Sequence, residues 1–76
     1  MRNHEENRKF AVRYGTALRE KRKFLNISGC ALAAMIGVHR NTLNHWERGE
    51  WLPNVYDDYR IKDAFAGVVL MRKAAR

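Results

Sequence analysis

Turn-forming residues divide this chain into pieces that each have the length of a helix. They occur at Asn26, at Gly37 and over residues 49–54, where Pro53 is the only proline of the chain. Between them, apolar residues recur mostly at intervals of three and four, the spacing that places side chains on one side of an α-helix. We therefore expect an all-α fold, a bundle of four to five short helices.

The length of 76 residues allows one domain, with little room for both a core and a catalytic cleft. A single cysteine, Cys30, excludes an internal disulfide, and no second thiol or paired histidine has the spacing of a zinc site. We expect Cys30 to be a small, buried or half-buried residue. The sequence thus predicts no enzyme, no metal, no cofactor and no small-molecule ligand.

The chain starts without an apolar signal segment and has no uninterrupted apolar run of membrane-spanning length. We expect a cytoplasmic, nucleoid-associated protein that does not enter a membrane. The formal net charge is +7, and residues 1–25 carry eight basic and three acidic side chains. This excess favours an anionic partner, with nucleic acid ahead of a membrane surface.

Three segments follow from these patterns. Residues 1–9 are expected to form a flexible basic arm, residues 10–66 the folded domain, and residues 67–76 a C-terminal segment with a possible dimer contact. The first helix should run from Phe10 to Leu25, and Asn26 should end it in a left-handed conformation. Four consecutive apolar residues at 68–71 fit a final helix or a short strand, and we favour the helix.

Two short helices in the middle of the chain form the central pattern. Ser28 is a good N-cap for a helix over residues 29–36 that Gly37 ends, and residues 40–48 form the next helix before Gly49. Small Ala33 allows the two helices to approach, while Leu43 and Trp46 face inward together with Leu32, Ile36 and Val38. Two such helices, joined by three residues, describe a helix-turn-helix. A further helix should follow Asn54.

Residues 14–53 resemble the phage-repressor and Cro-type helix-turn-helix domains, the XRE family. The resemblance rests on residues 14–22, Ile27-Ser28, Leu32-Ala33, residues 36–38 and Leu43, and above all on Trp46-Glu47-Arg48-Gly49 with Pro53 four residues later. It implies a lambda-repressor-like bundle of four to five helices. It also implies an ion pair between Arg22 and Glu47 that ties the first helix to the recognition helix.

The resemblance further implies that residues 39–48 enter the major groove of double-stranded DNA. The base-reading positions are then His39, Arg40, Asn41, Asn44 and His45. Side-chain chemistry suits these positions, because arginine can donate two hydrogen bonds to guanine and asparagine can pair with adenine. Arg40 and Asn41 are the leading candidates.

Phosphate contacts are expected from basic side chains and from the start of the second helix. The candidates are Arg13, Arg19, Lys21, Lys23, Ser28, Gly29, Thr42 and Arg48. Gly29 stands where the family commonly has glutamine, so a contact there can come only from the backbone. Trp51 is expected to cover the core, with stacking on a sugar-phosphate edge as the alternative.

A single recognition helix reads few base pairs, so we expect a homodimer on a pseudo-palindromic operator, acting as a transcriptional repressor. By elimination, the dimer contacts should be Phe65, Val68, Val69, Leu70 and Met71. The alternative is a protein-interaction module, such as an antitoxin or anti-repressor partner, that docks through residues 68–71. A basic amphipathic peptide on a membrane surface is a third, weaker interpretation.

Overall fold

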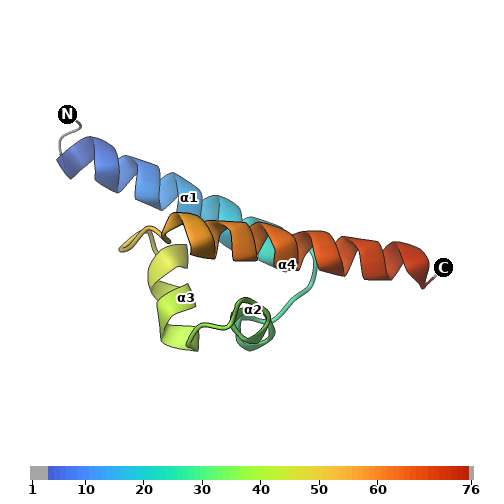
Figure 1. The fold of residues 1–76 in the computed structure, drawn as a ribbon. Helices are drawn as coiled ribbons and strands as arrows, with labels where there is room; N and C mark the ends of the chain where they lie inside the picture. Colours follow the sequence, from blue (N-terminus) through green and yellow to red (C-terminus); the bar gives the residue numbers. More distant parts are fainter. Residues whose placement is uncertain (1–3, 76) are drawn as a thin grey trace.

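Four α-helices make up the fold in the computed structural model, which describes residues 4–75. They are α1 (His4–Phe24), α2 (Gly29–Ile36), α3 (Arg40–Glu47) and α4 (Val55–Ala74) (Figure 1). No strand occurs in this part of the chain, which confirms the all-α prediction. The expectation that every helix is short is wrong for two of them, since α1 has 21 residues and α4 has 20.

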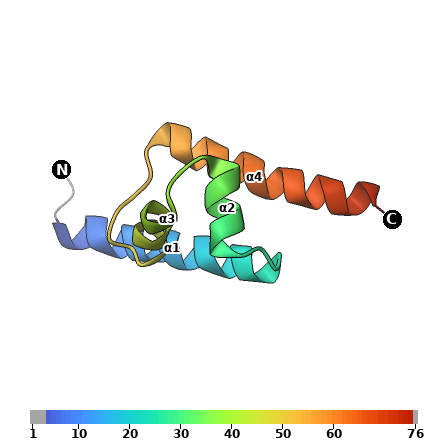
Figure 2. The same cartoon turned by 90° about the horizontal axis from the view of Figure 1, so that it is seen from below.

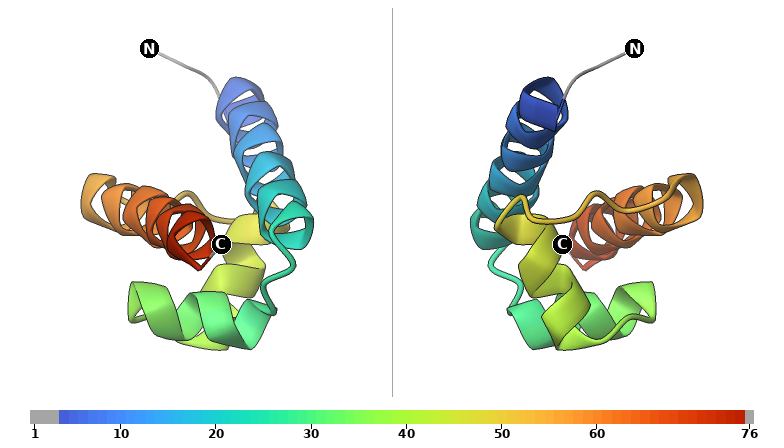
Figure 3. Two further views of the ribbon diagram at one scale, coloured as in Figure 1. Left: turned by 90° about the vertical axis from the view of Figure 1, so that its right-hand side faces the viewer. Right: turned by 90° about the vertical axis from the view of Figure 1, so that its left-hand side faces the viewer.

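The two long helices give the molecule an elongated shape of 47 × 20 × 20 Å. α1 and α4 run in the same general direction but are offset, so that the N-terminal end of α1 and the C-terminal end of α4 project at opposite ends (Figure 2). α2 and α3 lie below them in the view along the long axis (Figure 3). α3 packs against both α1 and α2, and α2 also contacts α4.

The core forms where all four helices meet. Leu32 and Leu43 are fully buried at its centre. The remaining buried members of this cluster are Leu18, Leu25, Ile27, Ala33, Ile36, Trp46, Ile61 and Phe65. No charged or polar residue is buried among the described residues, so the core is held by apolar packing alone.

Local hydrogen bonds set the ends of the short helices. Ser28 Oγ accepts from the amide of Ala31 at 3.0 Å and caps α2, as its side-chain chemistry predicts. Gly37 takes a left-handed conformation with φ of 85° and donates its amide to Ala33 O at 2.9 Å, which ends the helix. Asn26 also has a positive φ, of 59°. These caps confirm the predicted boundaries of the helix-turn-helix.

The two ends of the chain differ from the expected segments. α1 begins at His4, so residues 4–9 are the first turns of a helix and do not form an arm; residues 1–3 lie outside the described part. α4 continues through Gly67 to Ala74, which confirms the helical alternative for the C-terminal segment up to that residue, and residue 76 again lies outside. A boundary at residue 66 therefore falls inside a continuous helix.

A polar network connects α1 to α4 outside the core. Tyr14 donates its hydroxyl to Asp58 Oδ1 at 2.5 Å, and Lys62 Nζ lies 2.9 Å from Asp58 Oδ2. The hydrogen bond from Tyr14, with that from Lys62, holds the pKa of Asp58 below its usual range. Burial, together with the bond to Asp58, raises the pKa of Tyr14. Farther along α4, Arg72 donates to the carbonyl of Leu25 at the end of α1.

Candidate nucleic-acid interface

α3 has one apolar and one polar face. Leu43 and Trp46 are buried, with exposed fractions of 0% and 3%. Asn41, Asn44 and Arg48 follow at intervals of three and four on the opposite side of the helix. Of these, Asn41 and Arg48 are exposed and Asn44 is partly exposed. The helix thus turns hydrogen-bonding groups outward while its other side is fixed in the core.

An ion pair fixes the position of α3 on α1. Arg22 Nε donates to Glu47 Oε2 at 2.7 Å, and Arg22 Nη2 donates to Glu47 Oε1 at 3.0 Å. The two side chains are only 12% and 7% exposed. The hydrogen bonds to Glu47 raise the pKa of Arg22 further above its ordinary value. Arg22 Nη1 also donates to Ile27 O at 3.1 Å, so one guanidinium joins α1, α3 and the start of the α2 region.

Gly15 allows the close approach of α1 and α3 on which this pair depends. A Cβ at this position would overlap the backbone carbonyl oxygen of Trp46 and would lie 2.7 Å from that of Glu47. Both neighbours are backbone atoms, which cannot turn away as a side-chain end can. Sequence reasoning had not singled out this glycine, although a glycine inside an otherwise strong helix costs stability and so indicates a steric reason for its presence.

His39 is the N-cap of α3. Its Nδ1 accepts from the amide of Asn41 at 3.0 Å, while its backbone carbonyl accepts from Thr42 and Leu43. A ring nitrogen that accepts a hydrogen bond carries no hydrogen of its own, so Nε2 is the nitrogen that can donate. The side chain is exposed. His39 therefore has a structural role as a cap, and its Nε2 is the nitrogen left to donate to DNA.

Arg40, expected to read bases, lies along the flank of α3. Its Nη1 donates to Asn44 Oδ1, one turn later in the same helix. A Cβ on Gly29 would overlap the Arg40 guanidinium, so the missing side chain at the first residue of α2 makes room for it. The structure therefore brings three predicted site residues, Gly29, Arg40 and Asn44, into one contact.

His45 is covered by the segment that follows α3. Its ring stacks on Trp51 with ring centroids 3.8 Å apart. Its Nδ1 lies 3.4 Å from Glu50 Oε1 but makes no hydrogen bond within the described residues. Trp51 is 52% exposed, so the expectation that it covers the core is wrong. The loop turns back over α3 through backbone bonds from residues 50 and 51 to His45 O, which places the indole on the imidazole.

The expected phosphate-binding residues lie on different sides of the molecule. Arg19 faces α3 and lines a hollow there with Arg22 and Arg48. Lys21 faces α4, where its Nζ lies 5.3 Å from the centre of the Phe65 ring. The others are Arg13, Lys23 and Ser28, which are exposed, Thr42, which is partly exposed, and Gly29, which is buried beside Arg40. Of the basic residues of α1 that were proposed to bind phosphate, Arg19 is the one that lines a hollow with α3.

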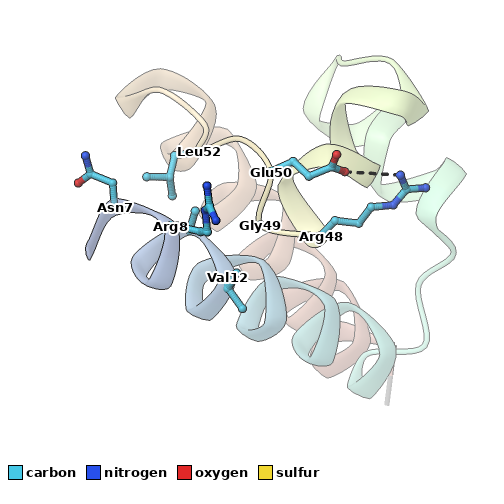
Figure 4. A pocket seen from close by; sticks show the side chains of 8 residues that line it. Asn7, Arg8, Val12, Arg48, Gly49, Glu50 and Leu52 are labelled. Atoms are coloured by element: carbon cyan, nitrogen blue, oxygen red, sulfur yellow. Dashed lines mark hydrogen bonds and ion pairs between the residues drawn. The ribbon is translucent and has the colours of Figure 1, made fainter. Parts of the chain in front are cut away.

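A further hollow lies between the first half of α1 and the loop after α3. It has a volume of about 520 Å³ and is lined by residues 7, 8, 11, 12, 48–50 and 52. In Figure 4 Arg8 reaches over this hollow, whereas Arg48 turns away from it and meets Glu50. The described lining has no histidine, serine, threonine or cysteine.

The expected dimer contacts differ in how far they are exposed. Phe65 is 4% exposed and belongs to the core of its own chain, so it is removed from the expected contact. Val68 and Val69 are partly buried against that core. Leu70 and Met71 are 66% and 74% exposed.

Cys30, expected to be at least half-buried, is exposed.

None of the described helices is long and apolar enough to cross a membrane. Within residues 4–75, histidine, cysteine and acidic residues form no cluster of three or more that could hold a metal ion.

Comparison with known families decides the type of this domain. The model of the helix-turn-helix family matches residues 18–55, half of the chain. The chain belongs to the helix-turn-helix family, of the Cro and XRE type. No curated protein and no solved structure matches it significantly. The helix-turn-helix match spans the end of α1, all of α2 and α3, and the first residue of α4, so it includes Arg22 and Glu47.

Domains of this helix-turn-helix type are DNA-binding regulatory domains. The chain is accordingly a DNA-binding regulator of the XRE type. The matched residues contain the whole outward face of α3. Most of α4 lies outside the matched residues.

Proposed function

We propose that this protein binds double-stranded DNA sequence-specifically, with residues 39–48 in the major groove. The polar outward face of α3, fixed from behind by Leu43 and Trp46, is the observation that carries the proposal. An α-helix of about 10–12 Å diameter fits the major groove, which is about 12 Å wide. The ion pair to Glu47 supports it further, since it holds the helix in one orientation.

Asn41 is the leading base-reading residue. It is exposed on the outward face, and its side-chain amide can both donate and accept, which suits the N6 and N7 edge of adenine. Asn44 stands one turn further on with its Oδ1 engaged by Arg40, which leaves its Nδ2 to donate. His39 and His45 offer Nε2, because their Nδ1 atoms face the protein.

The protein acts, in this proposal, as a homodimer and a repressor. Two recognition helices about 34 Å apart would reach successive turns of one face of the duplex, and the operator would be pseudo-palindromic. Leu70 and Met71 on the projecting end of α4 supply apolar surface for the dimer contact. Light scattering should give twice the chain mass when the protein is bound to its operator. A single chain on the operator would contradict the dimer.

Selection of bound fragments from random duplexes at physiological salt tests the proposal. We expect an enriched motif with two-fold symmetry, and we expect Asn41→Ala to lose the preference at one symmetric position while it keeps the rest. Such a substitution should cost about 1–3 kcal/mol of binding free energy on the selected site. Enrichment of no motif would contradict sequence-specific binding.

A protein-interaction module is the second candidate. The exposed Leu70 and Met71 favour it, and Leu70 also lines a mostly apolar hollow between α1 and α4 together with Lys21, Phe65 and Val69. This candidate predicts that Leu70→Ser abolishes function in the cell while the purified chain still dimerises on DNA and binds it unchanged. If Leu70→Ser instead weakens the dimer and DNA binding together, and Asn41→Ala also abolishes function, the DNA-binding proposal stands alone.

A further inference from the structure

Four arginine side chains line a hollow between α1 and α3. It has a volume of about 250 Å³, and its lining consists of Arg19, Arg22, Arg40, Asn44, Glu47 and Arg48. Pockets for drug-sized molecules are usually larger, about 300–1,000 Å³. The size and lining of the hollow suit a small anion.

The positive charge of this hollow is not neutralised from within. Glu47 is the one carboxylate in the lining, and both of its oxygens are engaged by Arg22. Arg19 has no hydrogen bond or ion pair within the described chain. Arg48 meets Glu50 at 3.5 Å, at a surface where ion pairs contribute little. Arg19, Arg40 and Arg48 thus converge with unused guanidinium donors.

Arg40 is held in an orientation that serves this hollow. Its guanidinium is fixed by Asn44 on one side and passes over Gly29, whose lack of a side chain gives it space. The guanidinium also lies at the first residue of α2, where the amides of the helix start add partial positive charge. A bound anion would relieve the repulsion between these groups. The planar guanidinium fork matches two oxygens of one phosphate group.

We propose that this hollow binds one phosphate group of the DNA backbone, and that Arg40 is a ligand of that phosphate and not a base-reading residue. The inference rests on the proposed function, because it requires α3 in the major groove. A helix that fills the groove has the phosphates of the groove wall against its flanks, and Arg40 lies along the flank. Arg19 on α1 then closes the site from the other side.

The salt dependence of DNA affinity tests the assignment. Each lost phosphate contact should lower the slope of log K against log salt concentration by about 0.9. Because the proposed dimer carries each substitution twice, wild type should lose about 12-fold more affinity than Arg40→Ala or Arg19→Ala between 50 and 200 mM salt, on every duplex sequence alike. Lys73→Ala is the matched control, since it removes the same charge at an exposed position near the C-terminal end of α4 and should leave the slope nearly unchanged.

A second variant separates position from charge. Gly29→Ala keeps every arginine but places a methyl group where the Arg40 guanidinium lies, and that flexible end can move away without unfolding the domain. We expect Gly29→Ala to weaken binding uniformly, and to add little when combined with Arg40→Ala. If the losses of binding free energy in the two single variants add fully in the double variant, the contact between Gly29 and Arg40 is not the cause of the weaker binding of Gly29→Ala.

The outcomes separate the site from the function. The phosphate assignment is overturned if Arg40→Ala still binds duplex DNA with an unchanged salt slope but loses its preference at one base pair. Arg40 is then a base-reading residue. A wild-type chain that binds no duplex overturns the proposed function and the site on DNA together. A titration with inorganic phosphate, followed by NMR of the arginine Nε–H signals, tests whether the hollow binds a free anion instead. Saturable shifts of the Arg19 and Arg40 signals, together with unaffected duplex binding in both alanine variants, would overturn the assignment to the DNA backbone.

Discussion

Removing one partner of the Arg22–Glu47 pair should destabilise the domain, whereas replacing both partners should not. Glu47→Leu leaves the Arg22 guanidinium without two of its three hydrogen bonds, because only the bond to Ile27 O remains, in a side chain that is 12% exposed. Breaking a buried pair in this way costs about 3–5 kcal/mol, and we expect the lower end because Arg22 retains some contact with water.

The whole domain should have a free energy of unfolding of about 4–11 kcal/mol, from the usual range per residue. A loss of about 3 kcal/mol is therefore a large fraction, and in a domain of this size it should lower the melting temperature by about 12–24 °C. The double variant Arg22→Met with Glu47→Leu places apolar side chains on both sides and should recover most of that loss.

Circular dichroism melts of wild type, both single variants and the double variant give the coupling free energy between the two residues. A Glu47→Leu variant that melts within about 4 °C of wild type would refute the reasoning, because it would mean that the pair contributes no more than a surface ion pair. The double variant also has the net charge of wild type. We expect it to bind the selected duplex more weakly despite its recovered stability, because the pair orients α3.

Substitutions at four further residues test other parts of the structure by thermal melts. His39→Ala should cost about 0.5–2 kcal/mol through loss of the N-cap of α3, whereas His39→Asn should cost little; equal losses would contradict the capping role. Tyr14→Phe should cost about 1.5 kcal/mol at neutral pH. The lowered pKa of Asp58 gives stability that is present above about pH 4 and is lost as pH falls through the lowered value. The free energy of unfolding of Tyr14→Phe should therefore fall less steeply with decreasing pH than that of wild type. A pH profile parallel to wild type would contradict this link. Gly15→Ala should cost about 1–3 kcal/mol by overpacking, while Gly67→Ala, with open space around it, should gain up to about 1 kcal/mol; a gain at both glycines would exclude the close approach of α1 and α3.

The helix boundaries in the middle of the chain could be predicted because they depend on local chemistry. Ser28 and Gly37 act through their own side chain and backbone conformation, and both signals are visible in the sequence. The ends were less predictable. The apolar pattern of α1 starts at Phe10, but the polar residues before it still continue the helix from His4. Periodicity marks the buried part of a helix and not its full length.

The outward face of α3 could also be predicted, but what its side chains do there could not. The spacing of Leu43 and Trp46 shows which face of α3 is buried. Spacing does not show that Arg40 bends toward Gly29, or that Trp51 returns over His45. These contacts join residues from separate elements, so they depend on the tertiary arrangement. The same holds for Phe65, because the sequence alone does not show whether this apolar residue lies in the core or on the surface.

NMR mapping of amide shifts with a selected duplex at physiological salt tests the central claim most directly. We predict that the largest shifts fall on Asn41, Asn44, His45 and Arg48, with smaller ones at the start of α2 and at Arg19. The projecting end of α4 should respond only through dimer formation, and its shifts should persist when Asn41→Ala removes the sequence preference. Shifts that gather on residues 66–75 and leave α3 unchanged would contradict the claim that α3 is the DNA-binding surface.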